Sequence, residues 1–415
     1  MVSNSHSTPT KPILPVVFGG DAGAYALGLE CYEAFGVRCL CVANEPVALI
    51  KESVFFDIQH IEPGASDEQR LASLTEVAEA NGDKHLILLA NSDGAIGFFA
   101  RHRHVLEEHY LIPSPTDATI AKLCDKDSFA EVCTDLGVAT PQTIVVNCAG
   151  ADDDWEAPLI DIPFPVVAKA SSGSAYEKVS FPGKRKIWFI STATELNELW
   201  SRLREAGFRD KFLVQQLIPG GDDQMRSLTF YVDSSGEVKL RSSAQVLLQD
   251  PSPTMIGNPV AMITEALPEL WESAERILKA GQYTGFANFD IKVDPRDDKP
   301  YFLEVNPRIG RNSYYVVAAG ANPMEIMAND LIDKRAQPRV DAVSPALYTL
   351  VPVSLIKKYT TDPILLQKVR FLVREHRVVN PLRRPVEKNL KRKAIALGQT
   401  YNYFRKFHRY FETGI

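Results

Sequence analysis

Apolar and polar residues alternate from Asn288 to Val293, within the stretch from residue 285 to residue 313, GFANFDIKVDPRDDKPYFLEVNPRIGRNS. The stretch predicts two strands, Ala287–Val293 and Tyr301–Val305, and the alternation gives the first of them one apolar face. The residues between them, 294–300, are polar and rich in Pro and Asp, which is typical of a hairpin connection. The pattern therefore predicts a half-buried β-hairpin with charged residues on its other face.

The first 115 residues show strands that alternate with helices. A buried strand is predicted over residues 13–19, an apolar helix up to about Phe35, and further strands over Arg38–Ala43 and His85–Ala90. This order predicts an α/β domain with a doubly wound parallel sheet. Asn91 to Gly94 follow a predicted strand and so lie at the carboxyl edge, where open sheets bind ligands.

A glycine-rich segment, GGDAGAYALG, follows the first predicted strand, and Glu45 follows the second. This arrangement is a weak dinucleotide fingerprint, because the spacing is not GxGxxG. We favour a glycine turn used for tight packing or for a substrate.

The middle of the chain mixes helices and strands. Helices are predicted over Thr116–Val138, Thr194–Ala206, Leu267–Ala280 and from Asn322 to Leu331, and strands over Thr143–Asn147, 164–170, 212–218, Met225–Val232 and Val238–Gln245. An acidic loop is expected over 151–156.

Length and composition place the chain among globular proteins of two or three domains. No apolar run approaches the roughly 18 residues that span a bilayer. The N-terminus MVSNSHSTPTKP has no apolar core of a secretory signal, and the six cysteines show no CxxC spacing. We therefore expect a cytoplasmic protein with reduced thiols.

The charge is distributed unevenly. From Ile356 onward there are 15 Lys and Arg against 4 Asp and Glu, and since the total is −6, residues 1–355 carry −17. This tail is predicted to be helical and is dotted with aromatic residues. It suits contact with an anionic membrane surface or packing on the acidic body, and both interpretations stay open; nucleic acid is not an expected partner, because no nucleic-acid-binding module is present.

Three oxygen-bearing side chains converge on the predicted hairpin. Glu304 and Asn306 share a face because strand side chains repeat every two residues, and a paired strand places Asp290 beside them. Two carboxylates and an amide suit Mg²⁺, with Mn²⁺ as an alternative. The other interpretation is an ordinary amphipathic hairpin with solvated charges.

Lys169 ends an apolar run, VVAKA, where a charge is costly unless an anion meets it. The following loop, 171–187, carries small polar residues and then Lys184, Arg185 and Lys186. Such a loop suits phosphate binding, although it lacks the GxxxxGK[ST] motif, and a plain surface hairpin is the alternative.

The run FLEVNPRxxRNS resembles the metal-binding end of the ATP-grasp superfamily, including carbamoyl phosphate synthetase and biotin carboxylase. Lys126, Lys169, the loop and the hairpin occur in the order that this superfamily uses. The resemblance implies an ATP-grasp fold (α+β in the grasp portion), ATP and Mg²⁺ as cofactors, and Asp290, Glu304 and Asn306 as metal ligands. It implies ATP contacts from Lys126, Lys169, Ser172, Lys184, Arg185, Lys186, Gln215, Gln216, Leu217, Ile218 and Asp222. Arg308, Arg311 and Arg226 are the expected catalytic residues.

Several phrases, among them FPGKRK, LVQQLIPGGDDQMR and QDPSPTMIGN, resemble ATP-grasp ligases that add D-aspartate to the lysine side chain of a peptidoglycan stem peptide. The resemblance implies an ATP-dependent carboxylate–amine ligase that uses an acyl phosphate. A ligase for another acid or amine and a non-catalytic ATP-binding protein remain alternatives. The expected domains are 1–115 (pre-grasp), 116–335 (ATP-grasp) and 336–415 (basic helical extension).

Overall fold

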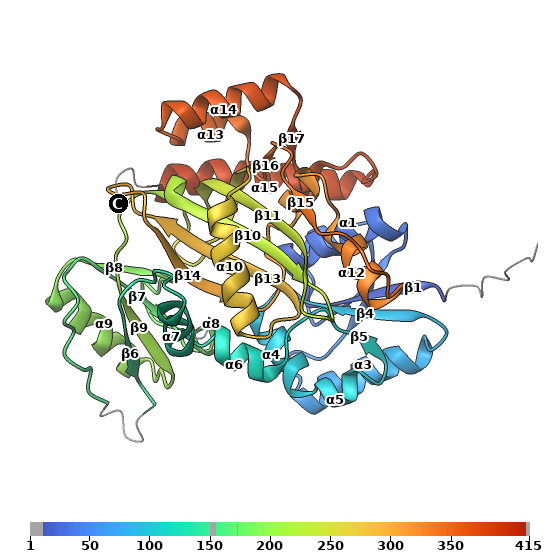
Figure 1. Cartoon of the computed structure of the whole chain (residues 1–415), viewed down its shortest axis with the longest axis horizontal. Coiled ribbons are helices and arrows are strands. Elements are labelled where there is room, and N and C mark those ends of the chain that lie inside the picture. Colours follow the sequence, from blue (N-terminus) through green and yellow to red (C-terminus); the bar gives the residue numbers. More distant parts are fainter. Residues whose placement is uncertain (1–10, 150–154, 172, 412–415) are drawn as a thin grey trace, which may run out of the picture.

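A computed structural model describes residues 11–149, 155–171 and 173–411 of the chain, and it contains three β-sheets with helices packed around them (Figure 1). The first sheet lies in the N-terminal part, a four-stranded sheet follows it in the chain, and a larger central sheet comes last. Most of the expected acidic loop, residues 151–154, lies outside the described residues.

The first sheet is parallel throughout and has the strand order β3-β2-β1-β4-β5. Its strands are β1 (Ile13–Phe18), β2 (Cys39–Ala43), β3 (Phe56–His60), β4 (His85–Leu89) and β5 (Tyr110–Leu111). Its helices are α1 (Ala22–Phe35), α2 (Ala48–Lys51), α3 (Asp67–Ala80), α4 (Asp93–Arg101) and α5 (Arg103–Leu106). The doubly wound domain predicted from the sequence is confirmed.

Two short helices, α6 (Asp117–Leu123) and α7 (Lys126–Asp135), lead into a four-stranded antiparallel sheet of order β6-β9-β7-β8. Its elements are β6 (Thr143–Asn147), β7 (Val166–Ala170), α8 (Gly173–Glu177), β8 (Trp188–Ile190), α9 (Ala193–Glu205) and β9 (Lys211–Gln216). An aromatic core that includes Trp155, Tyr176 and Trp200 packs against this sheet.

The central sheet has eight strands, of which seven follow the order β14-β13-β10-β11-β12-β16-β17 and the eighth, β15, pairs with β11. The strands are β10 (Met225–Val232), β11 (Val238–Gln249), β12 (Pro259–Thr264), β13 (Gly285–Val293), β14 (Pro300–Asn306), β15 (Val340–Ala342), β16 (Leu347–Thr349) and β17 (Val378–Val379). A 3₁₀ turn at Asp222–Gln224 and the helices α10 (Pro268–Ala280), α11 (Tyr314–Ala318) and α12 (Pro323–Leu331) complete this part. The hairpin predicted at the start is β13–β14.

The C-terminal segment folds back onto the body. It contains α13 (Val353–Tyr359), α14 (Pro363–Arg374), a 3₁₀ turn at Pro381–Arg383 and α15 (Leu390–Tyr410). Residues of α13–α15, Phe407 among them, share an apolar core with β11, β12 and β16. The sequence predicted a helical extension over residues 336–415, but β15, β16 and β17 in this segment also add strands to the central sheet. The predicted domain boundary at residue 335 stays a prediction.

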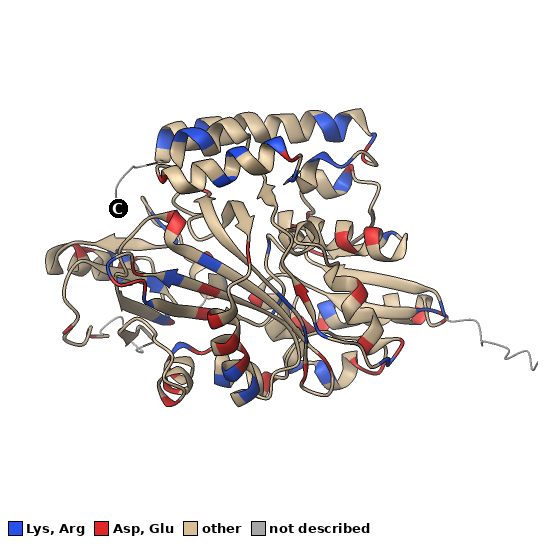
Figure 2. Ribbon diagram, turned by 45° about the horizontal axis from the view of Figure 1, so that its top comes forward, with Lys and Arg blue, Asp and Glu red and all other residues tan. Residues whose placement is uncertain are grey.

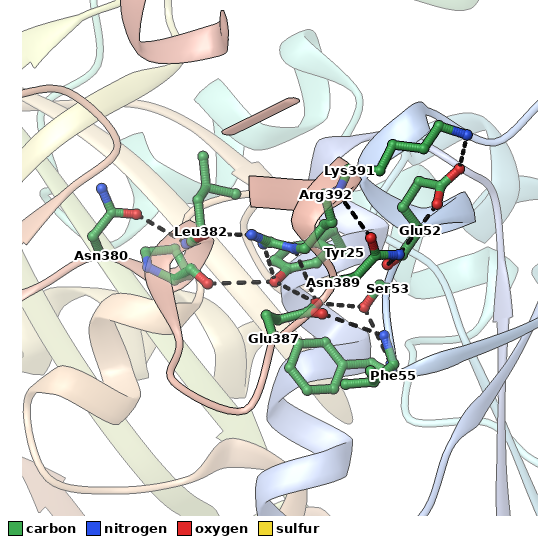
Figure 3. A network of polar contacts seen from close by, with 12 residues as sticks. Tyr25, Glu52, Ser53, Phe55, Asn380, Leu382, Glu387, Asn389, Lys391 and Arg392 are labelled. Carbon is green, nitrogen blue, oxygen red and sulfur yellow. Dashed lines mark hydrogen bonds and ion pairs between the residues drawn. The ribbon is translucent and has the colours of Figure 1, made fainter. Parts of the chain in front are cut away.

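A buried polar network fastens α15 to the first domain (Figure 3). Arg392 donates to the hydroxyl of Tyr25 at 2.5 Å and pairs with Glu387 at 3.1 Å, with only 1% of either charged side chain exposed. The Glu387 carboxylate also accepts from the Ser53 hydroxyl at 2.6 Å. The face of α15 that carries Arg392 therefore packs on the body of the protein, which was one of the two interpretations of the tail.

Candidate active site

The hairpin β13–β14 brings the three predicted metal ligands together. Asp290 and Glu304 are register partners, and Asn306 stands opposite Asn288, two residues along the strand. The side-chain amide of Asn306 donates to Asp290 Oδ2 at 3.2 Å, which fixes the direction of the carboxylate. The two-residue period of the strands thus places all three side chains at one position, as the sequence predicted.

Two lysines from different elements meet at Glu304. Lys126 is the first residue of α7, whose N-terminus is capped by Asp125, and Lys169 lies on β7. Their Nζ atoms lie 2.5 Å and 3.3 Å from the same oxygen, Glu304 Oε2. The charges of both lysines hold the pKa of Glu304 well below its usual range, whereas burial lowers the pKa of Lys169.

Asp290 lies in the opposite electrostatic situation. Burial and the neighbouring charge of Glu304 raise its pKa to about 6, against the influence of Arg308 and Asn306. A cation between the two carboxylates would favour their ionised forms, and the donors are hard oxygens, so this set fits Mg²⁺. Among the described residues no group of three His, Cys, Asp or Glu side chains could hold a metal, so a metal between Asp290 and Glu304 would take the amide oxygen of Asn306 as a third side-chain ligand.

The loop after β14 carries two of the predicted catalytic arginines. Arg308 donates through Nη2 to Asn306 Oδ1 at 3.3 Å and through Nε to Asp93 Oδ1 at 3.0 Å. Arg311 pairs with Asp21 through Nη2 and Oδ2 at 2.9 Å. Arg308 therefore links the candidate metal ligands to the first domain.

The basic residues of the predicted phosphate loop face in different directions. Lys184 donates to the carbonyls of Tyr176 and Val179 at 2.7 and 2.6 Å, so it braces the loop from within. The Arg185 guanidinium lies 5.8 Å from the Trp188 ring centroid. The charge of Lys186 lowers the pKa of both Asp290 and Glu304, which indicates that Lys186 lies near these carboxylates. Ser172, also predicted to contact ATP, lies outside the described residues.

The predicted adenine hinge is the end of β9 and the chain after it. Gln215 is buried and donates to Thr143 Oγ1 on β6 at 2.9 Å, while Gln216 pairs with Gln142 through its backbone at 2.8 Å. Leu217 is half-buried and Ile218 is buried, so the segment is fixed against the four-stranded sheet.

The two remaining predicted residues lie beside the hinge. Burial raises the pKa of Asp222 to about 6, and its Oδ2 accepts the backbone N–H of Gln249 at 2.8 Å. Arg226 donates to the carbonyls of Asp223 and Met225 at 2.8 and 3.0 Å. Its paired position on β13 is Ile291, which neighbours Asp290 but points to the other face of the sheet, so a catalytic role for Arg226 stays a prediction.

The sequence places Asn91 and Asp93 at the ligand-binding edge of the first sheet and Asp21 in the glycine-rich turn, but it predicts no contact for any of the three. Asp21 pairs with Arg311 and Asp93 with Arg308, and the Asn91 side chain packs on Gly23 in the first turn of α1. The signal that the sequence offered was the position of these residues directly after predicted strands, at the carboxyl edge of the sheet. Their arginine partners could not be predicted, because they lie more than 200 residues away in the chain; Asp93 and Arg308 are 215 residues apart.

The chain matches no family model. It is 26% identical over 416 residues to D-aspartate ligase of Enterococcus faecium, a match that covers 98% of each protein. The solved L-amino acid ligase of Bacillus licheniformis shares its fold with a TM-score of 0.54, 16% identity, and coverage of 77% of this chain and 74% of that one.

The biotin carboxylase domain of the Hydrogenobacter thermophilus 2-oxoglutarate carboxylase, solved with MgADP and bicarbonate, superimposes with a TM-score of 0.56. The two are 16% identical, and the match covers 80% of this chain and 72% of that one. The predicted fold and the predicted resemblance are both confirmed. The chain has the ATP-grasp fold of these solved structures, and along nearly its whole length it is similar to D-aspartate ligase.

Proposed function

We propose that the protein activates a carboxylate with ATP and joins it to an amine through an acyl phosphate. The observation that carries this proposal is the convergence of Lys126 and Lys169 on Glu304, beside Asp290 and Asn306. In the absence of a nucleotide the two lysines need a counter-ion, and Glu304 supplies it. When a nucleotide and a divalent cation bind, the two lysines would contact the phosphate oxygens and the two carboxylates would hold the metal.

The chain's own residues would act by position and charge. Asp290, Glu304 and Asn306 would hold Mg²⁺, or Mn²⁺ in its place, and the bound ion would supply positive charge to the phosphate oxygens. Lys126, Lys169 and Lys186 add cations around the transferred group, and Arg308 lies next to Asn306 on the side of the first domain. Phosphoryl transfer depends mainly on such positioning and electrostatic stabilisation. The loop 171–187 would exclude water, which otherwise hydrolyses an acyl phosphate.

For the substrates we propose D-aspartate as the acid and the lysine side chain of a peptidoglycan precursor as the amine. The support is the name of the relative that matches 98% of the chain. Another acid or amine is the second candidate, because the L-amino acid ligase shares the fold.

Hydroxamate formation tests the reaction directly. Purified protein, Mg-ATP and hydroxylamine are incubated with a panel of D- and L-amino acids, and hydroxylamine intercepts the acyl phosphate without the true acceptor. A signal with D-aspartate alone is the expected result. A signal with another acid overturns the choice of D-aspartate, and silence across the panel with ATP bound overturns the catalytic proposal.

We also propose that the protein works in the cytoplasm and that the outer face of the C-terminal helices contacts an anionic membrane surface. The described residues contain no helix of the length and apolarity that a bilayer crossing requires. Exposed apolar residues, however, recur along one side of α15: Leu390, Leu397, Tyr401 and Phe404. Exposed Lys393 and Arg405 flank them, and Figure 2 shows Lys and Arg along the helices at the top of the molecule. Such a face is typical of helices that lie on anionic lipid.

A further inference from the structure

The segment between β11 and β12, residues 250–258, is a compact loop with a closed base, and we call it the β11–β12 loop. The backbone N–H of Asp250 donates to the carbonyl of Asn258 at 2.9 Å. Oε1 of Gln249, the last residue of β11, accepts the N–H of Gly257 at 2.7 Å. The N–H of Gln249 itself donates to Oδ2 of Asp222, a residue predicted to contact ATP, at 2.8 Å. The base of the loop is therefore tied to one part of the candidate nucleotide site.

The body of the β11–β12 loop contacts the predicted phosphate loop at Lys186. The backbone N–H of Lys186 donates to the carbonyl of Pro253 at 2.9 Å. Gly257 has a φ of +89°, a left-handed conformation that glycine adopts without strain, and a Cβ atom there would lie 3.5 Å from Lys186 Nζ. The β11–β12 loop thus lies against both the backbone and the ammonium group of Lys186, the cation that lowers the pKa of Asp290 and Glu304.

The last turns of α15 hold the β11–β12 loop from outside the site. Lys406 Nζ pairs with Asp250 Oδ2 at 2.6 Å, and only 3% of the Asp250 side chain is exposed. Its other oxygen, Oδ1, accepts the N–H of Ser252 at 3.0 Å. One buried carboxylate therefore joins the C-terminal helix to the turn that precedes Pro253. Removal of one partner from such a buried pair leaves an uncompensated charge, so the loop should lose its fixed position.

We propose that Asp250 and Lys406 are positioning residues, which hold the phosphate loop so that Lys186 reaches the phosphates of the nucleotide. This inference rests on the proposed function. Both residues act through the β11–β12 loop and Lys186. The C-terminal helix is thereby a part of the ATP-binding machinery as well as a cover for the central sheet. A purely structural anchor for α15 would affect folding but not the contacts to the phosphates.

Nucleotide binding to the full chain separates these two roles. Lys406→Met and Asp250→Asn should weaken Mg-ATP binding about threefold or more, because they misplace a charged contact to the phosphates. Binding of AMP, which lacks the two outer phosphates, should not change. Asn keeps the acceptor for the Ser252 N–H, so Asp250→Asn removes the charge alone. Lys406→Arg keeps the positive charge and should bind Mg-ATP as the wild type does.

A double-mutant cycle tests whether the pair acts through Lys186. Lys186→Ala alone should weaken Mg-ATP binding about tenfold or more, because it removes a charge-assisted contact. In that background Lys406→Met should weaken binding no further, since the residue that it positions is gone. Equal losses from Lys406→Met with and without Lys186 would overturn the proposal.

Hydrogen exchange provides a readout without nucleotide. Lys406→Met should speed the exchange of the Lys186 amide, whose acceptor is the Pro253 carbonyl. The matched control is Lys391→Met, which breaks an ion pair between the same helix and Glu52. The control should change neither this exchange rate nor the affinity for Mg-ATP.

The outcomes distinguish this proposal from the proposed function. If the wild type binds Mg-ATP and forms a hydroxamate, but Lys406→Met and Asp250→Asn bind Mg-ATP equally well, the proposed function stands and the positioning role is overturned. If both variants weaken Mg-ATP and AMP binding to the same extent, the ion pair serves folding alone and the positioning role is again overturned. If the wild type binds no Mg-ATP, the proposed function fails and the positioning role fails with it.

Discussion

Lys126 and Glu304 are separated by 178 residues in the chain, yet Nζ of one lies 2.5 Å from Oε2 of the other. Lys169 reaches the same oxygen from a different sheet. The site is therefore assembled from the start of α7, the end of β7 and the end of β14, and the two lysines neutralise a carboxylate that we assign to the metal. This relationship makes Glu304 the residue whose removal should be most informative.

Glu304→Gln should reduce ADP release by about a hundredfold or more, since it removes a metal ligand charge from a preorganised site. The side chain keeps its shape, so nucleotide binding should persist. ADP release in a coupled assay with the preferred acid measures the effect. Asp341→Asn, which weakens an ion pair with Arg241 outside the site, is the matched control and should keep its turnover. Equal turnover in Glu304→Gln and the wild type would remove Glu304 from the mechanism.

Glu30 should make the stability of the protein depend on pH. Burial raises its pKa from an ordinary value of 4.5 to about 8, opposed by the hydrogen bond that Ser313 Oγ donates to it. Between these two values the unfolded chain loses a proton that the folded chain keeps, so this contribution to stability is complete below pH 4.5 and disappears as the pH rises through 8.

Glu30→Gln removes that titration and keeps the acceptor for Ser313. Urea unfolding at pH 5, 6.5 and 8 should show the variant gaining stability over the wild type as the pH rises. A stability difference that stays constant over this range would show that Glu30 titrates normally.

Arg392→Met should cost about 3–5 kcal/mol of unfolding free energy, because it leaves Glu387 buried without its partner. Lys391→Met is the matched control: it breaks the neighbouring ion pair with Glu52, whose lysine is 73% exposed, and should cost less than about 1 kcal/mol. Denaturant unfolding of both variants measures the difference. Equal costs would mean that the network in Figure 3 contributes no more than a surface pair.

Leu397→Glu with Tyr401→Glu should abolish co-sedimentation with liposomes that contain anionic phospholipid and leave ligase turnover unchanged. Both side chains are more than 60% exposed, at 63% and 67%, so the fold should tolerate the change. Deletion of residues 356–415 is unsuitable here, since it also removes buried Phe407 and Arg392. Wild-type protein that stays in the supernatant would refute membrane contact.

The sequence was most informative where the signal is local. The two-residue period placed Asp290, Glu304 and Asn306 on one face, and the apolar neighbours of Lys169 marked it as a partly buried cation. It was least informative where a contact depends on distant segments. The basic composition of the tail could not show that Arg392 is buried, because its partners include Tyr25, 367 residues away. Nor could it show that Lys184 turns back to its own loop carbonyls instead of toward Glu304.

The network around Arg392 also has a consequence for synthesis on the ribosome. Tyr25 and Ser53 leave the ribosome early, but their partners Glu387 and Arg392 are made more than 300 residues later, with 334 residues between Ser53 and Glu387. At roughly 5–20 residues per second, this delay lasts on the order of 15 to 70 seconds. During that time the nascent first domain lacks the contacts that Glu387 and Arg392 later make with Tyr25 of α1 and with Ser53 after α2.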